Sequence, residues 1–427
     1  MGCGPEVDMF WCLLDGEAAF PSVERNIQVR ELFSAGERGD LLQYSRNTYQ
    51  NTECHVKDQN QLSRRIVEHK GNRQGHVRAS GHFKAYMNSC LNDLTRSNLG
   101  FLIGLLCITV VCVADDAYLL SCSPSGLQGA LDIIGHSASR YQQTFNADKT
   151  AVVITGSRLD MQYYKDTATW TINGEKIKVV DSNDHLGLIV SGIDEEQKNV
   201  DANIAKCRSA LFATLGPAFA YKCLLSPTTQ LHVWRTCLLP VLLSGLPALP
   251  IRGAQIKCLT LFHNKILRGI LKLSQSSPIP ALHFLLGELP IEAILHIRTL
   301  GIFHNIWSNP STTVFQMGLY ILMMRKENST TWFHHIQLLC MTYGLPNPSS
   351  LMKISPPWSR DDWNHMVKIR VTAWHERKLR STSTLNSKMA YLNVELQGLS
   401  GRPHPVLMKI LNVQEIKKVR AHLKSLF

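Results

Sequence analysis

Acidic side chains that directly follow apolar runs are the residues of this sequence best suited to chemistry. Asp115 and Asp116 come after fourteen nearly continuous apolar residues at 101–114, and Asp15 closes a second apolar run, MFWCLL at 9–14. Two adjacent like charges at the end of a buried segment are costly unless a cation compensates them. Three carboxylates on neighbouring strand ends therefore predict a divalent metal site for phosphoryl transfer, because Mg²⁺ prefers oxygen ligands. A simple hairpin turn, where Asp is common, is the alternative for the adjacent pair.

A second Asp-Asp pair, Asp361-Asp362, has a sufficient structural explanation. It follows SPPWSR and precedes an amphipathic run containing Trp363, Val367 and Trp374. This pattern predicts a helix with Ser359 as its N-cap, where acidic residues in the first turn are favourable. Asp115-Asp116 has no helix cap to explain it and is therefore the Asp-Asp pair that indicates a metal site.

The composition predicts a folded chain of more than one domain. It has 427 residues, of which 44% are hydrophobic and 18% charged, and this excludes a disordered protein. The twelve cysteines are scattered, without a CxxC pair or a secretory signal. We therefore expect reduced thiols and an intracellular protein, with no basis for choosing between nucleus and cytoplasm.

Charge is distributed unevenly along the chain. The formal net charge is +12, composed of −5 over residues 1–200 and +17 over residues 201–427. A basic half predicts an acidic partner such as nucleic acid or an anionic membrane. The apolar run 101–114 is shorter than the roughly 20 residues that span a bilayer, so we expect no membrane partner.

Hydrophobic periodicity changes near residue 195. Before it, strands at 9–15, 101–114 and 117–121 alternate with helices at 82–95 and about 125–144, and a hairpin joins 53–57 to 64–69. After it, residues 195–215, 225–238 and most of 255–380 follow a helical period. The sequence thus predicts an α+β domain followed by a helical region.

Five segments resemble, in order, the successive motifs of reverse transcriptases of the non-LTR (LINE-type) retrotransposon family. They are FWCLLDGEAAFPSV, GNRQGHVRASGHFKAYMN, CVADDAYLLS, FNADKT and HLGL, which together cover roughly residues 9–190. The resemblance implies a right-hand polymerase: a palm with an antiparallel sheet and helices at 1–194, an all-α thumb at 195–300, and a basic helical region at 301–427. It implies an RNA template, a DNA primer and deoxynucleoside triphosphates as partners.

The resemblance also assigns roles to individual residues. Asp15, Asp115 and Asp116 match the metal ligands, which would hold two Mg²⁺ ions, with Mn²⁺ as a possible substitute. Lys149 matches the lysine that assists the leaving group. The remaining matches are the nucleotide and template contacts Phe20, Arg73, Gln74 and Gly75, and the primer-gripping hairpin at Leu186 and Gly187.

Each of these assignments has a plain alternative. A lone Phe20 is ordinarily a core residue, Arg73-Gln74-Gly75 an ordinary turn, and Lys149 a solvated lysine. Pro21 stands where the family commonly has an acid. Because only fourteen residues precede Asp15, we expect a fragment that lacks the fingers segment and the endonuclease, with weak or no polymerisation in isolation. A non-catalytic nucleic-acid-binding remnant is the alternative function.

Basic residues of the later half are candidates for contacting a duplex backbone. Solvated helix faces are the alternative for each, and the tryptophans 358, 363 and 374 are expected in a helical core. The candidates are Lys206, Arg208, Lys222, Arg235, Lys265, Arg268 and Lys272, with denser runs at 375–380 and 416–424.

Overall fold

The chain forms two compact units. The structure is a computed structural model that describes residues 8–16, 19–113, 116–216, 225–324, 330–355, 357–384, 389, 398–399 and 401–408. One unit comprises Met1–His185 and Val190–Ile193, and we name it the sheet unit. The other comprises Leu186–Ile189 and Asp194–Phe427, and we name it the helical unit.

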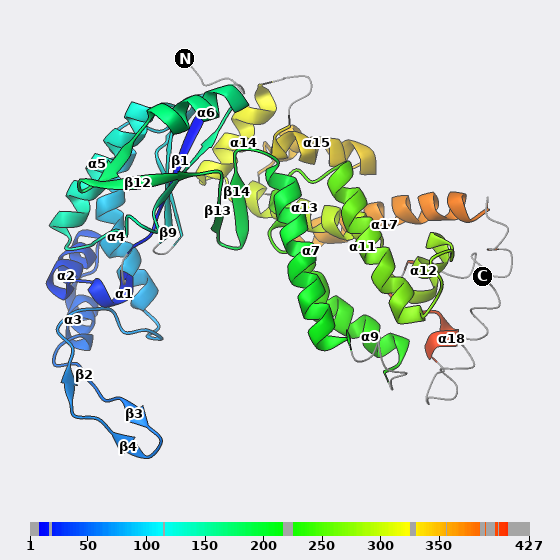
Figure 1. Cartoon of the computed structure of the whole chain (residues 1–427), viewed down its shortest axis with the longest axis horizontal. Coiled ribbons are helices and arrows are strands. Elements are labelled where there is room, and N and C mark those ends of the chain that lie inside the picture. Colours follow the sequence, from blue (N-terminus) through cyan, green and yellow to red (C-terminus); the bar gives the residue numbers. More distant parts are fainter. Residues whose placement is uncertain are drawn as a thin grey trace. The chain divides into compact units, whose positions relative to one another are not determined.

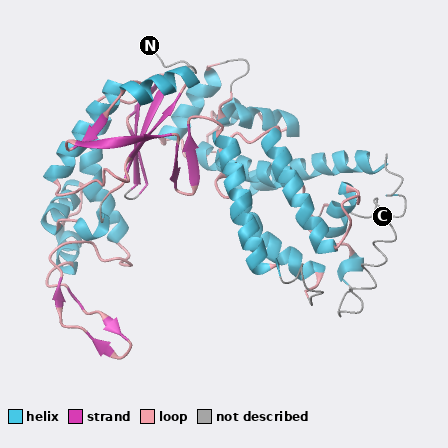
Figure 2. Cartoon of the chain, in the orientation of Figure 1, coloured by secondary structure: helices cyan, strands magenta, loops and turns pink. Residues whose placement is uncertain are grey.

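The sheet unit is a mixed α/β structure (Figures 1 and 2). Its strands are β1 (Met9–Leu14), β2 (Glu53–Cys54), β3 (Lys57–Asp58), β4 (Gln61–Leu62), β5 (Ile66–Val67), β6 (Phe101–Ile103), β7 (Leu106–Ile108), β8 (Val110–Val113), β9 (Asp116–Ser121), β10 (Ala151–Thr155), β11 (Trp170–Ile172), β12 (Glu175–Val180) and β13 (Ser182–His185), and β14 (Leu188–Ser191) follows. Its helices are α1 (Ala19–Ser22), α2 (Arg25–Ser34), α3 (Gly39–Thr48), α4 (Ala79–Arg96), α5 (Pro124–Arg140) and α6 (Arg158–Thr167).

Strand β1 lies inside the main six-stranded sheet, whose order is β11-β12-β10-β1-β9-β8. It pairs antiparallel with β10 on one side and with β9 on the other. A strand with partners on both edges and cover on its faces needs apolar side chains, which MFWCLL supplies. Phe10, Cys12 and Leu14 are completely buried. The predicted strand at 9–15 is thus confirmed and is central.

Helices α4 and α5 supply the core on which one face of this sheet packs. Their apolar positions recur at helical spacing, and Phe83, Cys90, Leu127 and Leu131 join the core that contains Phe10. Helix α5 begins at a well-formed cap, because the Ser123 hydroxyl accepts a hydrogen bond from the Gly126 amide (3.0 Å). The predicted helix at 82–95 is confirmed.

Two details of the predicted sheet are wrong. Residues 101–114 do not form one strand: Gly104, at φ +60°, turns the chain between β6 and β7, and β8 follows as an edge strand. The sheet is also not wholly antiparallel, because β10 and β12 are parallel. Parallel neighbours require a long crossover connection, and α6 and β11 supply it between these strands.

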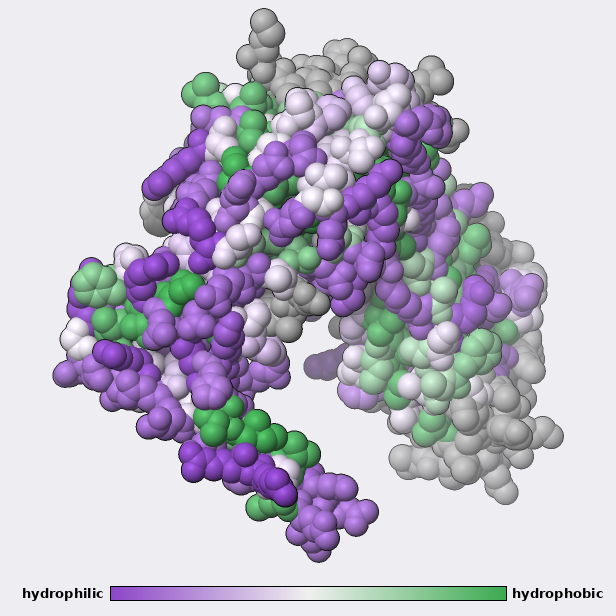
Figure 3. All heavy atoms as spheres, turned by 60° about the vertical axis from the view of Figure 1, so that its left-hand side comes forward, coloured by the Kyte–Doolittle hydropathy of each residue, from purple (hydrophilic) through white to green (hydrophobic). Residues whose placement is uncertain are grey.

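A long hairpin leaves the sheet unit between α3 and α4. Strand β2 pairs with β5, and β3 pairs with β4 toward the tip, which confirms the predicted pairing of 53–57 with 64–69. Apolar side chains are exposed along this hairpin, which is partly green in Figure 3. They are Val56, Leu62, Ile66 and Val67.

The helical unit follows in sequence. Its elements are α7 (Glu195–Thr214), α9 (Pro227–Val233), a π-helix (Trp234–Leu238), α10 (Leu239–Leu242), a 3₁₀-helix (Leu246–Ala248), α11 (Ala254–Leu271), α12 (Ile279–Leu286), α13 (Ile291–Trp307), α14 (Thr313–Met323), α15 (Trp332–Tyr343), α16 (Pro348–Leu351), α17 (Arg360–Thr384) and α18 (Pro405–Met408). The predicted helix at 195–215 is confirmed as α7.

Two hydrophobic clusters fill the described part of the helical unit. The first is built by α7 to α13 around residues such as Trp234 and Leu267. The second is built by α13 to α17 around Trp307 and Trp363. Trp363 is fully buried and donates its Nε1–H to the Leu300 carbonyl (2.9 Å), whereas Trp358 is 37% exposed. The prediction of a core role therefore holds best for Trp363.

The N-terminus of α17 has the predicted cap. The Ser359 hydroxyl accepts a hydrogen bond from the Asp362 amide (3.1 Å), so a structural role explains this Asp-Asp pair.

Among the described residues, no single helix is long and apolar enough to cross a membrane. Helices α12 and α13 meet that length and composition only as a pair, bent by 60°. Both contribute fully buried side chains to the clusters above, among them Leu282 and Phe303.

Candidate active site

Three of the predicted catalytic residues lie together at one end of the sheet. Leu13 pairs with Ala151 of β10, and Leu14 pairs with Ala117 of β9. Continuing the register with β9 by one residue past the end of β1 sets Asp15 opposite Asp116, the first residue of β9. Lys149 lies in the turn before β10, and its ammonium group is 3.6 Å from Asp15 Oδ2. Residues directly opposite in an antiparallel pair project from the same face. Two carboxylates and one ammonium group therefore share one end of the sheet.

Asp15 is held through both its backbone and its side chain. Its amide donates to the Thr150 hydroxyl (3.4 Å), and its carbonyl accepts from the Asn146 amide (2.9 Å). Its Oδ2 lies 3.6 Å from Lys149 Nζ, with side-chain exposures of 33% for Asp15 and 68% for Lys149. Lys149 thus compensates this carboxylate from the solvent side.

Asp116 begins β9 and is half-buried. His185, the last residue of β13, lies close by. Burial lowers the pKa of the His185 imidazole, and the Asp116 carboxylate acts in the opposite direction. The His185 ring meets the Tyr118 ring edge-on, with centroids 4.3 Å apart. The sequence predicts no role for His185 or Tyr118, although His185 is the first residue of the HLGL motif.

Asp115 lies outside the described residues, between Val113 of β8 and Asp116 of β9 in the chain. The described residues contain no group of three or more His, Cys, Asp or Glu side chains arranged to bind a metal ion. Two of the three predicted ligands, Asp15 and Asp116, do meet at one sheet end. Carboxylate oxygens are the ligands that Mg²⁺ takes, so the donor chemistry of this end fits a divalent cation.

Phe20 is half-buried and stacks on Phe83, with ring centroids 4.8 Å apart. Core packing accounts for this contact, and the nucleotide-gating role stays a prediction. The Phe20 carbonyl accepts from the Asn72 amide (2.8 Å). Phe20 therefore lies beside Asn72, which directly precedes the predicted nucleotide and template contacts Arg73, Gln74 and Gly75.

Arg73, Gln74 and Gly75 form an exposed turn. The His76 amide donates to the Arg73 carbonyl (3.4 Å), and Gly75 has φ +82°, a conformation that favours glycine. An added Cβ at Gly75 would meet no atom within 4 Å. Glycine is therefore required there by backbone conformation, and the turn leaves its polar groups open to solvent.

The predicted hairpin at Leu186 and Gly187 is present. These two residues connect β13 to β14, and both have positive φ, +49° and +82°. Two left-handed residues in a two-residue loop are typical of a tight hairpin turn. Leu186 is 60% exposed, and its contact with a primer stays a prediction.

The region that holds these residues resembles one known family. Residues 9–190 match the family model of reverse transcriptase (RNA-dependent DNA polymerase). The match confirms the predicted resemblance at this level over the same residues. Reverse transcriptases generally copy a nucleic acid template from a primer, using nucleotides and divalent metal ions, and the match supports these properties for the matched region. No curated protein matches the chain.

The basic candidates of the helical unit differ in their surroundings. Lys206 and Arg208 are exposed on α7. Lys265, Arg268 and Lys272 line an open pocket of about 620 Å³ near the C-terminal end of α11. Lys222 and the run 416–424 lie outside the described residues.

Arg235 is engaged within the fold, contrary to its prediction as a duplex contact. Its Nε donates to Glu288 Oε2 (2.6 Å), and it also donates to the carbonyls of Gly401 (2.8 Å) and Gly287 (3.3 Å). The Glu288 side chain is only 4% exposed. Burial raises the pKa of this carboxyl, and the Arg235 charge opposes that shift.

Glu288→Ala is expected to destabilise the helical unit by about 3 kcal/mol, because it leaves the Arg235 guanidinium without its buried counter-ion. Thermal or urea unfolding followed by helical circular dichroism measures this change. Glu292→Ala is the matched control: Glu292 pairs with Lys378 at 3.7 Å in a more exposed setting, where the cost is about 1 kcal/mol or less. Equal losses in the two variants would contradict the assignment.

Proposed function

We propose that this chain is the polymerase part of a LINE-type retrotransposon protein, and that it extends a DNA primer 3′-hydroxyl along an RNA template. The observation that carries the proposal is the grouping of Asp15 and Asp116 at the end of two paired strands, with Lys149 paired to Asp15, inside the residues that match reverse transcriptase.

Asp15 and Asp116, together with Asp115, would hold two Mg²⁺ ions, with Mn²⁺ as a substitute. Bound metal ions would favour attack of the 3′-hydroxyl on the α-phosphate of a nucleotide and stabilise the charge of the pyrophosphate that leaves. The protein contributes position: β1 and β9 are adjacent strands in a packed sheet, which fixes the separation of their terminal carboxylates.

Lys149 has a second role in this proposal. Its ammonium group neutralises Asp15 in the free protein, and its 68% exposure leaves the side chain free to turn toward a triphosphate. There it would stabilise or protonate the leaving group. Phe20 would exclude a ribose 2′-hydroxyl, Arg73, Gln74 and Gly75 would contact nucleotide and template, and the turn at Leu186 and Gly187 would hold the primer end.

The helical unit would act as a thumb in residues 195–300, followed by a helical basic region in 301–427. Exposed Lys206, Arg208 and Lys265 suit contact with backbone phosphates, because neutralising each phosphate releases counter-ions.

The proposal is tested by primer extension with the purified full chain on an RNA template. We expect slow incorporation of deoxynucleotides that requires added Mg²⁺ or Mn²⁺ and stops with EDTA. Binding of an RNA–DNA hybrid should weaken as salt is added. A plot of the logarithm of the binding constant against the logarithm of the salt concentration should have a slope of about −0.7 to −0.9 per phosphate contact. Lys265→Gln should reduce that slope by about one contact, and Lys353→Gln, outside the candidate set, should leave it unchanged.

Salt-dependent binding without any metal-dependent extension would favour the alternative, a non-catalytic nucleic-acid-binding remnant. Absence of both binding and extension would overturn the proposal.

A further inference from the structure

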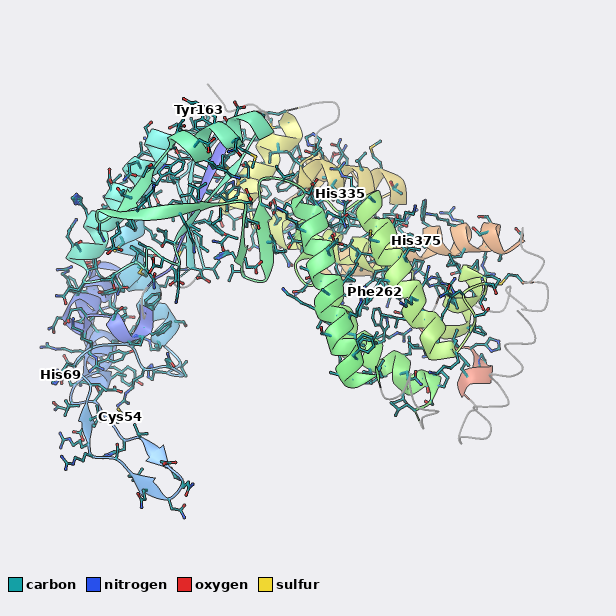
Figure 4. All side chains as sticks on the ribbon, in the orientation of Figure 1. Cys54, His69, Tyr163, Phe262, His335 and His375 are labelled. Carbon is teal, nitrogen blue, oxygen red and sulfur yellow. The ribbon has the colours of Figure 1, made fainter. Side chains whose placement is uncertain are left out.

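Arg25, the first residue of α2, closes the base of the projecting hairpin. Cys54 and His69, labelled in Figure 4, mark the stem of this hairpin. The Arg25 guanidinium donates to the carbonyls of Tyr49 (3.0 Å), Glu68 (2.6 Å), Lys70 (3.0 Å) and Gly71 (3.0 Å) and to the hydroxyl of Thr52 (2.7 Å).

All three nitrogens of this guanidinium are therefore occupied by acceptors that come from both ends of the hairpin. The Arg25 side chain is 12% exposed, and its Nη2 also lies 3.6 Å from Glu68 Oε2. Burial lowers the pKa of the guanidinium, and the Glu68 carboxylate opposes this. Such a planar fork of donors can only be provided by arginine, because a lysine ammonium has one nitrogen with three donors.

Gly71, the last acceptor, is wedged against the segment that carries Phe20. Its amide donates to the Val23 carbonyl (2.8 Å). It has φ +94°, and an added Cβ would stand 3.0 Å from the Pro21 carbonyl oxygen. The chain at Gly71 is thus held by Arg25 on one side and by α1 on the other.

Asn72 carries this constraint across the next turn. Its Oδ1 accepts from Gln28 Nε2 (2.7 Å), and its Nδ2 donates to the Ala79 carbonyl (3.4 Å). Asn72 therefore joins α2 to the first residue of α4. The Arg73–Gly75 turn lies between these two anchors, with its own side chains exposed.

The far end of the turn is anchored separately. Arg78 donates to the Ser45 hydroxyl (2.9 Å) and pairs with Glu37. Because neither end of the 72–78 segment is free, the exposed turn between them has few conformations available. Such a segment pays little ordering entropy when it meets a ligand.

We propose that Arg25 is a positioning residue, which holds the Arg73–Gly75 turn in the conformation that meets nucleotide and template. The template and nucleotide part of this inference rests on the proposed function. The positioning part concerns the protein alone, since the contacts of Arg25 fix Gly71, two residues before the turn.

Arg25→Lys tests the proposal because it keeps the charge and removes the fork. Hydrogen exchange of the full chain should show amides of residues 71–76 exchanging at least about tenfold faster, while β1 and β9 keep their protection. In primer extension, the KM for nucleotide should rise at least about tenfold and kcat should change less than about threefold. Arg30→Lys is the matched control on the same helix, where the arginine side chain is 62% exposed and should change neither readout.

Unchanged exchange at 71–76 in Arg25→Lys would overturn the proposal. Faster exchange throughout the sheet unit would also overturn it, because Arg25 would then serve general stability. Faster exchange at residues 71–76 with unchanged KM and kcat would overturn the claim that Arg25 positions the turn for nucleotide and template. If the unsubstituted chain extends no primer, the proposed function fails, whereas local exchange still decides the positioning role.

Discussion

Asp116→Asn is expected to lower the rate of primer extension by at least about a hundredfold, since in the proposed function Asp116 holds a metal ion that contributes several kcal/mol to transition-state stabilisation. Asparagine retains the size of the side chain and one oxygen but removes the charge that a divalent cation needs. Asp15→Asn is expected to have a similar effect, with the additional loss of the 3.6 Å ion pair to Lys149.

The folded state should tolerate this change. Asp15 and Asp116 are the next residues beyond the last pair between β1 and β9, Leu14 with Ala117, at the end of the sheet, where like charges on neighbouring strands repel each other. Removing one of them should leave the melting temperature equal to that of the unsubstituted chain or raise it slightly. Hybrid binding and its salt dependence should also persist, which separates loss of chemistry from loss of fold.

Asp361→Asn is the matched control, because it makes the same change in the other Asp-Asp pair. Asp361 is exposed in the first turn of α17, and its replacement should leave extension unchanged. Extension by Asp116→Asn at more than about a tenth of the normal rate would argue against a role for this carboxylate in metal binding.

Acidification is expected to unfold the helical unit well before the sheet unit. Five buried histidines of the helical unit have lowered pKa values, all chiefly because burial disfavours the charged ring: His263, His283, His296, His335 and His375. Burial lowers the pKa to about 4 in His283 and His335 and to about 3 in His296 and His375. His335 and His375 are labelled on α15 and α17 in Figure 4.

The direction of the pH dependence follows from these shifts. At pH values below about 6.5, the pKa of an unfolded histidine, unfolded chains bind protons that the folded, neutral rings exclude. Stability is therefore fully present above about pH 7 and is lost as the pH falls from about 6.5 toward 4. At pH 5 each excluded proton costs on the order of 2 kcal/mol. The five together cost about 10 kcal/mol, which is comparable to the usual stability of a domain, about 5–15 kcal/mol.

Circular dichroism at pH 7, 6 and 5 measures this loss as a falling melting temperature of the helices. His263→Phe removes one of the five groups at a ring that stacks on Trp234, with centroids 5.4 Å apart. The variant should lose less stability between pH 7 and pH 5, by about one proton's contribution. His365→Gln, at an exposed position of α17, should retain the original pH dependence. A pH-independent melting temperature would contradict the prediction.

Local patterns predicted much of this fold. The apolar spacing of α4 and the Ser359 cap of α17 depend on neighbours within one or two helical turns, so the sequence carries them directly. The motif order also brought Asp15, Asp116 and Lys149 into one hypothesis before any register was known. Asp15 and Asp116 come together because each stands at the end of one of two neighbouring strands, and Lys149, in the turn before β10, reaches Asp15 through its side chain.

Contacts between distant segments could not be predicted in this way. Arg25 binds carbonyls that are 24 to 46 residues away, and backbone carbonyls leave no residue-type signal. The turn between β6 and β7 inside the run 101–114 depends on a single glycine with φ +60°, and the apolar composition of the run gives no sign of it. Arg235 is predicted from the sequence to be a surface cation because its partner, Glu288, is 53 residues later in the sequence, and the sequence alone does not indicate this pairing.

The central place of β1 has a consequence for synthesis on the ribosome. Residues 9–14 are made well before their partners, which are β9 at 116–121 and β10 at 151–155. At about 5–20 residues per second, roughly 7–28 s pass between synthesis of MFWCLL and completion of both neighbouring strands. During that interval an apolar strand has two unpaired edges, which is the kind of segment that chaperones bind and that aggregates when they are scarce. Yield of soluble protein should therefore depend on translation speed and chaperone supply.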